Sequence, residues 1–303
     1  MDSILPRHIP LTSTNTFTHD FYGFMPLKIE EMSLNFSRGY GLGANFFYLL
    51  WELVDLKAFG LVPTKITAHL QMYNNYEFYN NCFYQNKELI KVWIDKDVSE
   101  IYKMRYSMAK TVYGLGSSLN DLKPHLDNFN LIFKAYFNFK QFLYDRADMF
   151  IKEKNIDLDN TTFIWWRKSN KVTEVLNYPS YNDIKGHIIN SDTMTNILQT
   201  DDIEVIREFS ELKNVKDLDI LPIFDTSTCI DNAVQANSPE QFKEIYNKDY
   251  IENIYDAFVL AIIASKCKRF IGFPGHMSQL VLFLRQDFNN INTFIFKSGK
   301  ELF

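Results

Sequence analysis

Four charged residues follow a short apolar segment in the second half of the chain. The segment is Phe163–Trp166, and the charged residues after it are Arg167, Lys168, Lys171 and Glu174. Side chains at the end of a strand project into the crevice beyond the sheet, so cations there suit an anion such as a diphosphate. The residues alone leave one alternative open, which is a solvated loop after an edge strand.

Two further polar sets have the same position relative to predicted strands. Each set comes after an apolar, strand-like segment and before a helical one: Asp201 and Asp202, then Gly275, His276 and Ser278. Because the carboxyl ends of parallel strands lie on one edge of a sheet, we expect the three sets to share a crevice. Carboxylates there suit sugar hydroxyls, a base edge or proton transfer. A role of the two aspartates as simple helix caps stays open.

A glycine-rich loop in the first half could also bind an anion. Gly41, Gly43 and Asn45 lie between a predicted strand, Met32–Phe36, and a predicted helix, Phe46–Leu56. A strand, a glycine loop and a helix present backbone N–H groups to an anion. The glycine spacing differs from the dinucleotide fingerprint, so a tight turn that needs glycine is an equal alternative.

Alternating strands and helices predict an α/β fold. In the second half, helical segments separate the predicted strands 163–166, 195–200, 219–224, 269–273 and 293–296. This order is typical of a parallel, doubly wound sheet. In the first half we also expect a strand over Leu89–Ile94 and helices over 97–113 and 130–150. The polar segment Lys152–Asn160 indicates a boundary between an N-terminal domain, 1–155, and a C-terminal domain, 156–303.

Composition excludes several classes of protein. The 303 residues are 46% hydrophobic and carry a net charge of −5, which argues against a general nucleic-acid binder. The three cysteines, Cys82, Cys229 and Cys267, lack CxxC spacing and suggest reduced thiols. The N-terminus lacks the features of a signal peptide, and the longest apolar run is too short to span a bilayer. We therefore expect a cytoplasmic protein, of a bacterium or of an infected host cell.

Taken together, the three polar sets resemble a known group of enzymes. Their order is similar to that in the GT-B glycosyltransferases of the fucosyltransferase superfamily, such as the nodulation and core N-glycan fucosyltransferases. That group has H-x-R-R-x-D-K and a glutamate after one strand, T-D-[DS] after the next, and a Phe-Ser-Ser or Phe-Pro-Pro loop. The corresponding segments here are Trp165–Lys171 with Glu174, then Thr200–Asp202, then Phe273–Ser278. The resemblance covers roughly residues 160–286.

The resemblance implies a fold and an activity. It implies two Rossmann-like doubly wound domains facing a cleft, with the acceptor on the N-terminal side and the nucleotide-sugar on the C-terminal side. It further implies metal-independent transfer of fucose from GDP-fucose to a glycan hydroxyl, with inversion and without a cofactor. The partners would then be a nucleotide-sugar donor and a glycan acceptor. The glycine loop of Gly41, Gly43 and Asn45 fits the start of the first domain.

The resemblance also implies roles for individual residues. Arg167 would bind the donor diphosphate and stabilise the leaving nucleotide, and Lys168 takes the place of a second arginine. Lys171 matches the lysine of the motif, and Glu174 would be the general base. The remaining donor contacts implied by the resemblance are Asp201, Asp202, Gly275, His276 and Ser278, with Asp256 as the acid nearest to the position that reads the base.

Two positions depart from the motif and keep other readings open. Trp165 stands in place of the motif histidine, which helps to hold guanine, and Asn170 in place of the motif aspartate. One alternative is a transferase for another nucleotide-sugar. A second is a non-catalytic protein that binds a nucleotide-sugar or a glycan on the same fold. A third is an unrelated doubly wound protein that handles a phosphorylated ligand.

Overall fold

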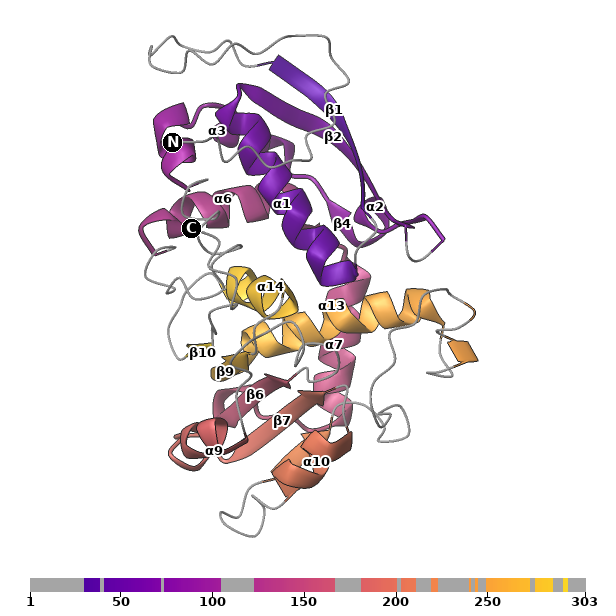
Figure 1. The fold of residues 1–303 in the computed structure, drawn as a ribbon, viewed down its shortest axis with the longest axis vertical. Helices are drawn as coiled ribbons and strands as arrows, with labels where there is room; N and C mark the ends of the chain where they lie inside the picture. Colours follow the sequence, from indigo (N-terminus) through magenta and orange to yellow (C-terminus); the bar gives the residue numbers. More distant parts are fainter. Residues whose placement is uncertain are drawn as a thin grey trace.

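Two sheets with parallel strands, one from each half of the chain, form the frame of the computed structural model (Figure 1). The structure describes residues 30–38, 41–71, 74–104, 123–166, 181–200, 203–210, 219–222, 240, 243–244, 249–272, 276–285 and 291–293. Figure 1 shows helices α13 and α14 lying between the two sheets. The α/β class predicted from the sequence is confirmed.

The sheet of the first half forms around one β–α–β unit. Its elements are β1 (Glu30–Arg38), α1 (Leu42–Ala58), β2 (Leu61–Leu70) and β3 (Tyr76–Glu77). Strands β1 and β2 are parallel, and β3 pairs antiparallel with the end of β2. Helix α1 is apolar over most of its surface and is buried along its length. The carboxyl ends of β1 and β2 therefore lie on the edge where α1 begins.

Short elements complete the first half. They are α2 (Tyr79–Cys82), β4 (Phe83–Tyr84), α3 (Lys87–Ile94), α6 (Leu126–Tyr136), β5 (Asn138–Phe139) and α7 (Gln141–Glu153), with a 3-10 turn at Lys123–His125. A second 3-10 turn, Leu158–Asn160, leads into the second half. Strands β4 and β5 pair antiparallel. The predicted helix over 130–150 is thus interrupted by β5, because Phe139 pairs with Phe83 instead of continuing the helix.

The predicted strand over Leu89–Ile94 is wrong, since these residues belong to helix α3. The side chain of Asn86 accepts hydrogen bonds from the backbone N–H groups of Glu88 and Leu89, which caps the helix. Ile90 and Trp93 are both buried, and their spacing of three residues places them on one helical face.

The second half is a five-stranded parallel sheet with the order β10-β9-β6-β7-β8. The strands are β6 (Thr161–Trp166), β7 (Thr195–Thr200), β8 (Asp219–Pro222), β9 (Arg269–Gly272) and β10 (Ile291–Thr293). The helices between them include α9 (Tyr181–Ile189), α10 (Ile203–Ser210), α13 (Tyr250–Lys266) and α14 (His276–Arg285). The predicted parallel sheet is confirmed, and the strand order reverses between β6 and β9.

The two faces of this sheet pack into different cores. One face, with Ile164, Trp166 and Leu198, forms a small cluster with α9 and α10. The other face, with Phe163 and Trp165, belongs to a core that continues through α13 and α14 into the first half. The two halves are therefore joined by continuous apolar packing.

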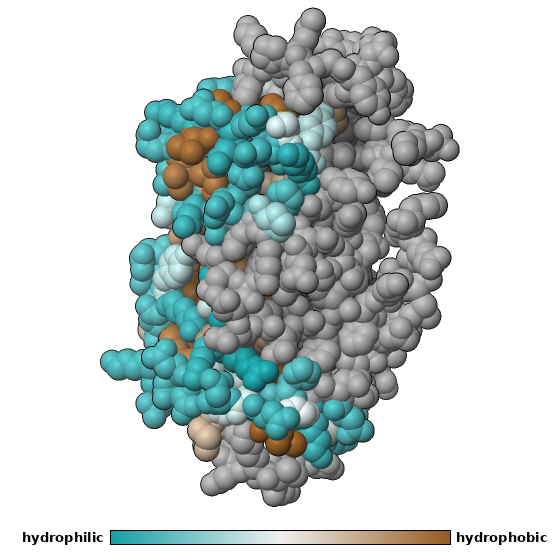
Figure 2. Space-filling model, turned by 90° about the vertical axis from the view of Figure 1, so that its left-hand side faces the viewer, coloured by the Kyte–Doolittle hydropathy of each residue, from teal (hydrophilic) through white to brown (hydrophobic). Residues whose placement is uncertain are grey.

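Among the described residues, which are the coloured ones in Figure 2, no extended apolar region is visible on this face. Hydrophobic residues there form small patches within a mostly hydrophilic surface. Within the described ranges, none of the helices combines the length and the apolar character needed to cross a membrane.

Candidate functional site

The edge of the second sheet between β6 and β9 is the candidate site. Trp165 of β6 is the register partner of Gly272 of β9, so the two strands end side by side. The strand order reverses here, and in open α/β sheets ligands bind outside the carboxyl ends of the strands at such a switch point. On the other side of β6, Trp166 pairs with Thr200, the last residue of β7.

Several predicted site residues come directly after the strands that end at this edge. Arg167 directly follows β6 in the sequence, and Asp201 directly follows β7. Seven of the predicted residues lie outside the described residues: Arg167, Lys168, Lys171, Glu174, Asp201, Asp202 and Gly275. Because Trp166 pairs with Thr200, the segment that begins with Arg167 and the segment that begins with Asp201 start from neighbouring positions.

Helix α14 begins earlier than the sequence suggests. We predicted a loop through Ser278, whereas the helix begins at His276. Ser278 is 5% exposed, and a Cβ atom added to Gly272 would lie 3.1 Å from its Cβ atom. The first turn of α14 therefore packs directly on the end of β9. Backbone N–H groups and the helix dipole at this point favour an anion.

The glycine loop predicted before Phe46 is wrong in part, because α1 begins at Leu42 and includes Gly43 and Asn45, and the first turn of this helix meets the same turn of α14. A Cβ atom on Gly43 would lie 3.0 Å from Cγ and 3.1 Å from the backbone N of Met277. The buried side chain of Asn45 donates a hydrogen bond from Nδ2 to the carbonyl of Gly41, at 3.2 Å, and so holds the start of α1. Two of the predicted residues therefore lie where the two halves meet: Gly43 on the first turn of α1 and Ser278 on the first turn of α14.

Two aromatic residues of this region were missed by the sequence reading. The rings of Phe47 and Tyr48 on α1 lie 5.4 and 5.8 Å from the imidazole of His276. Both belong to the segment Phe46–Leu56, for which the sequence predicted a helix and no part in the site. Their contact with His276 depends on the packing of α14 against α1, and neither segment contains a local sequence pattern that predicts this packing.

The contact between Gly43 and Met277 yields a prediction with an internal control. Gly43→Ala is expected to lower the free energy of unfolding by about 1–3 kcal/mol, because the added methyl group meets backbone of α14. Gly186→Ala is the control. Gly186 lies within α9 with open space around it, so alanine there should stabilise by about 0.5–1 kcal/mol. Urea unfolding of both variants measures the difference, and equal effects would contradict the close approach of α1 to α14.

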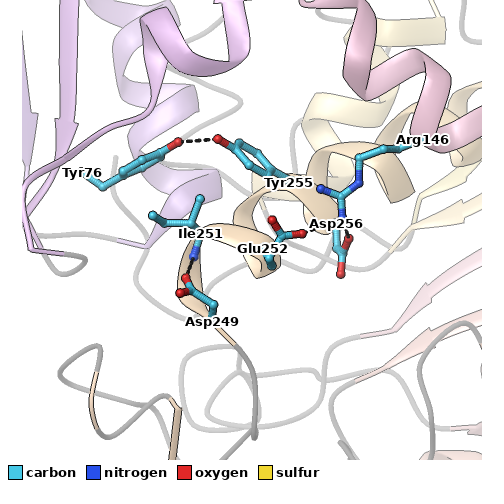
Figure 3. A network of polar contacts seen from close by, with 7 residues as sticks. All are labelled: Tyr76, Arg146, Asp249, Ile251, Glu252, Tyr255 and Asp256. Atoms are coloured by element: carbon cyan, nitrogen blue, oxygen red, sulfur yellow. Dashed lines mark hydrogen bonds and ion pairs between the residues drawn. The ribbon is translucent and has the colours of Figure 1, made fainter.

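Asp256 lies in a polar network that ties α13 to α7 and to β3 (Figure 3). Arg146 of α7 forms ion pairs with Asp256, at 3.1 Å, and with Glu252, at 2.7 Å. Tyr76 of β3 and Tyr255 of α13 share a hydrogen bond of 2.8 Å between their hydroxyl groups. Burial and this hydrogen bond raise the pKa of Tyr76, so its phenol stays protonated. The network therefore links α13 to two elements of the first half.

The two cysteines that the structure describes are not suited to act as thiolate nucleophiles. Burial raises the pKa of both Cys82 and Cys267 to about 12, so both stay protonated at neutral pH. Within the described ranges there is also no group of three or more His, Cys, Asp or Glu residues that could hold a metal ion.

The backbone is similar to solved fucosyltransferase structures. A crystal structure of POFUT1 in complex with GDP aligns with a TM-score of 0.49 and 10% sequence identity, over 88% of this chain and 98% of that one. NodZ alpha-1,6-fucosyltransferase soaked with GDP-fucose aligns with a TM-score of 0.43 and 12% identity, over 84% and 93%. No protein-family model and no curated protein matches the chain. These similarities concern the backbone, so the function is inferred from the residues of the chain itself.

Proposed function

We propose that the chain is an inverting, metal-independent glycosyltransferase that transfers fucose from GDP-fucose to a hydroxyl of a glycan. The observation that carries this proposal is the switch point between β6 and β9. The cationic segment that begins with Arg167 follows one of these strands, and the first turn of α14 packs on the end of the other. Cations and a helix N-terminus at one crevice suit a diphosphate.

Each half of the protein has a separate task in this proposal. On the donor side, Arg167, Lys168 and Lys171 contact the diphosphate together with the first turn of α14. Asp201 and Asp202 after β7 hold the donor from the neighbouring strand. On the acceptor side, the start of α1 closes the site through the contact of Gly43 with Met277.

The proposed reaction is a direct displacement. The acceptor oxygen attacks the anomeric carbon of the sugar while the bond from that carbon to the diphosphate oxygen breaks, and the configuration inverts. Glu174 takes the proton of the acceptor hydroxyl, and GDP leaves with the bonding electrons. The negative charge that develops on the diphosphate is stabilised by Arg167 and by the N–H groups of α14.

A panel of nucleotide-sugars tests the donor. We expect GDP and GDP-fucose to raise the melting temperature, because a ligand at 100 times its Kd adds about 2.7 kcal/mol to the stability of the folded state. Stabilisation by UDP-sugars or CMP-sugars alone would overturn the choice of donor. Transfer to a glycan, measured with and without EDTA, tests the reaction itself.

Binding without turnover would favour the second candidate, a non-catalytic binding protein. The replacement of the motif histidine by Trp165 and of the motif aspartate by Asn170 is what favours it. The assay for this candidate is GDP-fucose hydrolysis and transfer by the wild-type protein at saturating donor concentration.

A further inference from the structure

We propose that Gln199 recognises the base of the nucleotide, and this inference rests on the proposed function. Gln199 is the penultimate residue of β7 and is the register partner of Trp165, which in turn is the partner of Gly272. The three residues therefore form one row across the candidate site. Their side-chain positions share one face of the sheet, since register partners point to the same side.

Within the described residues, the side-chain oxygen of Gln199 has no hydrogen-bond donor. Its Oε1 atom is buried and accepts no hydrogen bond from the part of the chain that the structure describes, although the residue itself is partly exposed. A buried acceptor without a donor is destabilising, and native proteins keep few of them. One physical reason to keep such a group at the edge of a candidate site is that a ligand donates to it.

The row has the dimensions of a nucleoside diphosphate. Ser278 packs against Gly272 at one end of the row, and Gln199 lies two strands away at the other. Two strand spacings amount to about 10 Å. A diphosphate held at the first turn of α14 would therefore extend its base across Trp165 towards Gln199.

The chemistry of the row fits a base better than a sugar. A carboxamide carries an acceptor and a donor side by side, which matches the edge of a base with an adjacent donor and acceptor. Between the two ends lies Trp165, an apolar residue that is 8% exposed. Gln199 would thus determine which base is accepted, whereas the diphosphate contacts are the same for every nucleotide.

The test compares two side-chain amides of the same strand. Gln199→Leu is the test variant and Asn196→Leu is its control. Asn196 is fully buried, and neither of its amide atoms has a partner within the described residues. Its neighbour Ile197 belongs to the core on the Trp165 side, so alternation directs Asn196 to the opposite face. Both variants remove an unpaired polar group, so both should melt at or above the wild-type temperature without ligand.

Calorimetric titration with GDP and with inorganic pyrophosphate then separates the outcomes. We expect Gln199→Leu to weaken GDP binding about tenfold and to leave pyrophosphate binding unchanged, while Asn196→Leu changes neither. Unchanged GDP affinity, or an equal loss for pyrophosphate, would overturn the assignment. If Gln199→Leu does not fold, Gln199→Met tests the same point. Absence of any nucleotide binding by the wild type is a different result, because it contradicts the proposed function itself.

Discussion

Replacing Arg167 by alanine is expected to lower the rate of fucose transfer about 100- to 1,000-fold while the protein remains folded. Arg167 directly follows β6, one of the two strands between which the sheet order reverses. The other is β9, and the residue after it is Phe273, which carries no charge. The charge on the departing diphosphate is larger in the transition state than in bound GDP-fucose. Loss of the guanidinium should therefore reduce kcat more than it raises KM.

A surface arginine provides the control for this variant. Arg207 lies on α10, its side chain is 63% exposed, and it pairs with Glu204 one turn away. Arg207→Ala removes the same side chain and should leave transfer unchanged. Arg167→Lys is expected to fall between the alanine variant and the wild type, because lysine keeps the charge and loses the bidentate geometry. Wild-type kcat in Arg167→Ala would rule out a diphosphate site at the end of β6.

The elements of the second half were readable from the sequence because each strand is short, apolar and followed by polar residues. The predicted strand over 195–200 coincides with β7, and that over 163–166 falls within β6. Burial on both faces of a parallel sheet produces such runs. The strand β2 was missed because Pro63 and the exposed Lys65 interrupt its apolar pattern.

Two predictions of local structure were wrong, and each has a physical cause. Leu89–Ile94 is rich in β-branched and aromatic residues, but its Ile90 and Trp93 also fit helical spacing, and the cap at Asn86 decides for the helix. The segment Pro274–Ser278 begins with proline and glycine and was therefore predicted to be a loop, yet the helix starts directly after these two residues, at His276. Proline shortly before a helix is compatible with either reading.

The candidate site was predictable only in part. Strand ends identify residues that project towards one edge, so the sequence could predict a shared edge for the ends of β6, β7 and β9, and the pairing of these strands agrees with it. Of the three polar sets predicted at that edge, the structure describes His276 and Ser278. The approach of Gly43 to Met277, and the row of Gly272, Trp165 and Gln199, depend on the packing of helices and on strand order. Those are long-range properties, for which a single sequence provides no local pattern.

Replacing Phe258 by alanine is expected to lower the free energy of unfolding by about 3–5 kcal/mol. Phe258 lies on α13, is fully buried, and packs against the rings of Phe83, at 5.2 Å, and Phe139, at 5.3 Å. These two residues belong to β4 and β5 of the first half. The variant therefore removes packing at the junction of the two halves as well as core volume.

The control for Phe258→Ala is Phe209→Ala in the separate cluster on the far face of the second sheet. Phe209 is also fully buried, and its ring lies 5.1 Å from that of Trp166.

Because the main core is continuous through α13, we expect the wild type and both variants to unfold in one transition, with circular dichroism and tryptophan fluorescence coinciding. Two separate transitions in Phe258→Ala alone would instead mean that 1–155 and 156–303 are stable domains which α13 merely connects. Coincident transitions would mean that the donor and acceptor sides of the proposed site are held in one fixed arrangement, since a large apolar interface opposes domain motion.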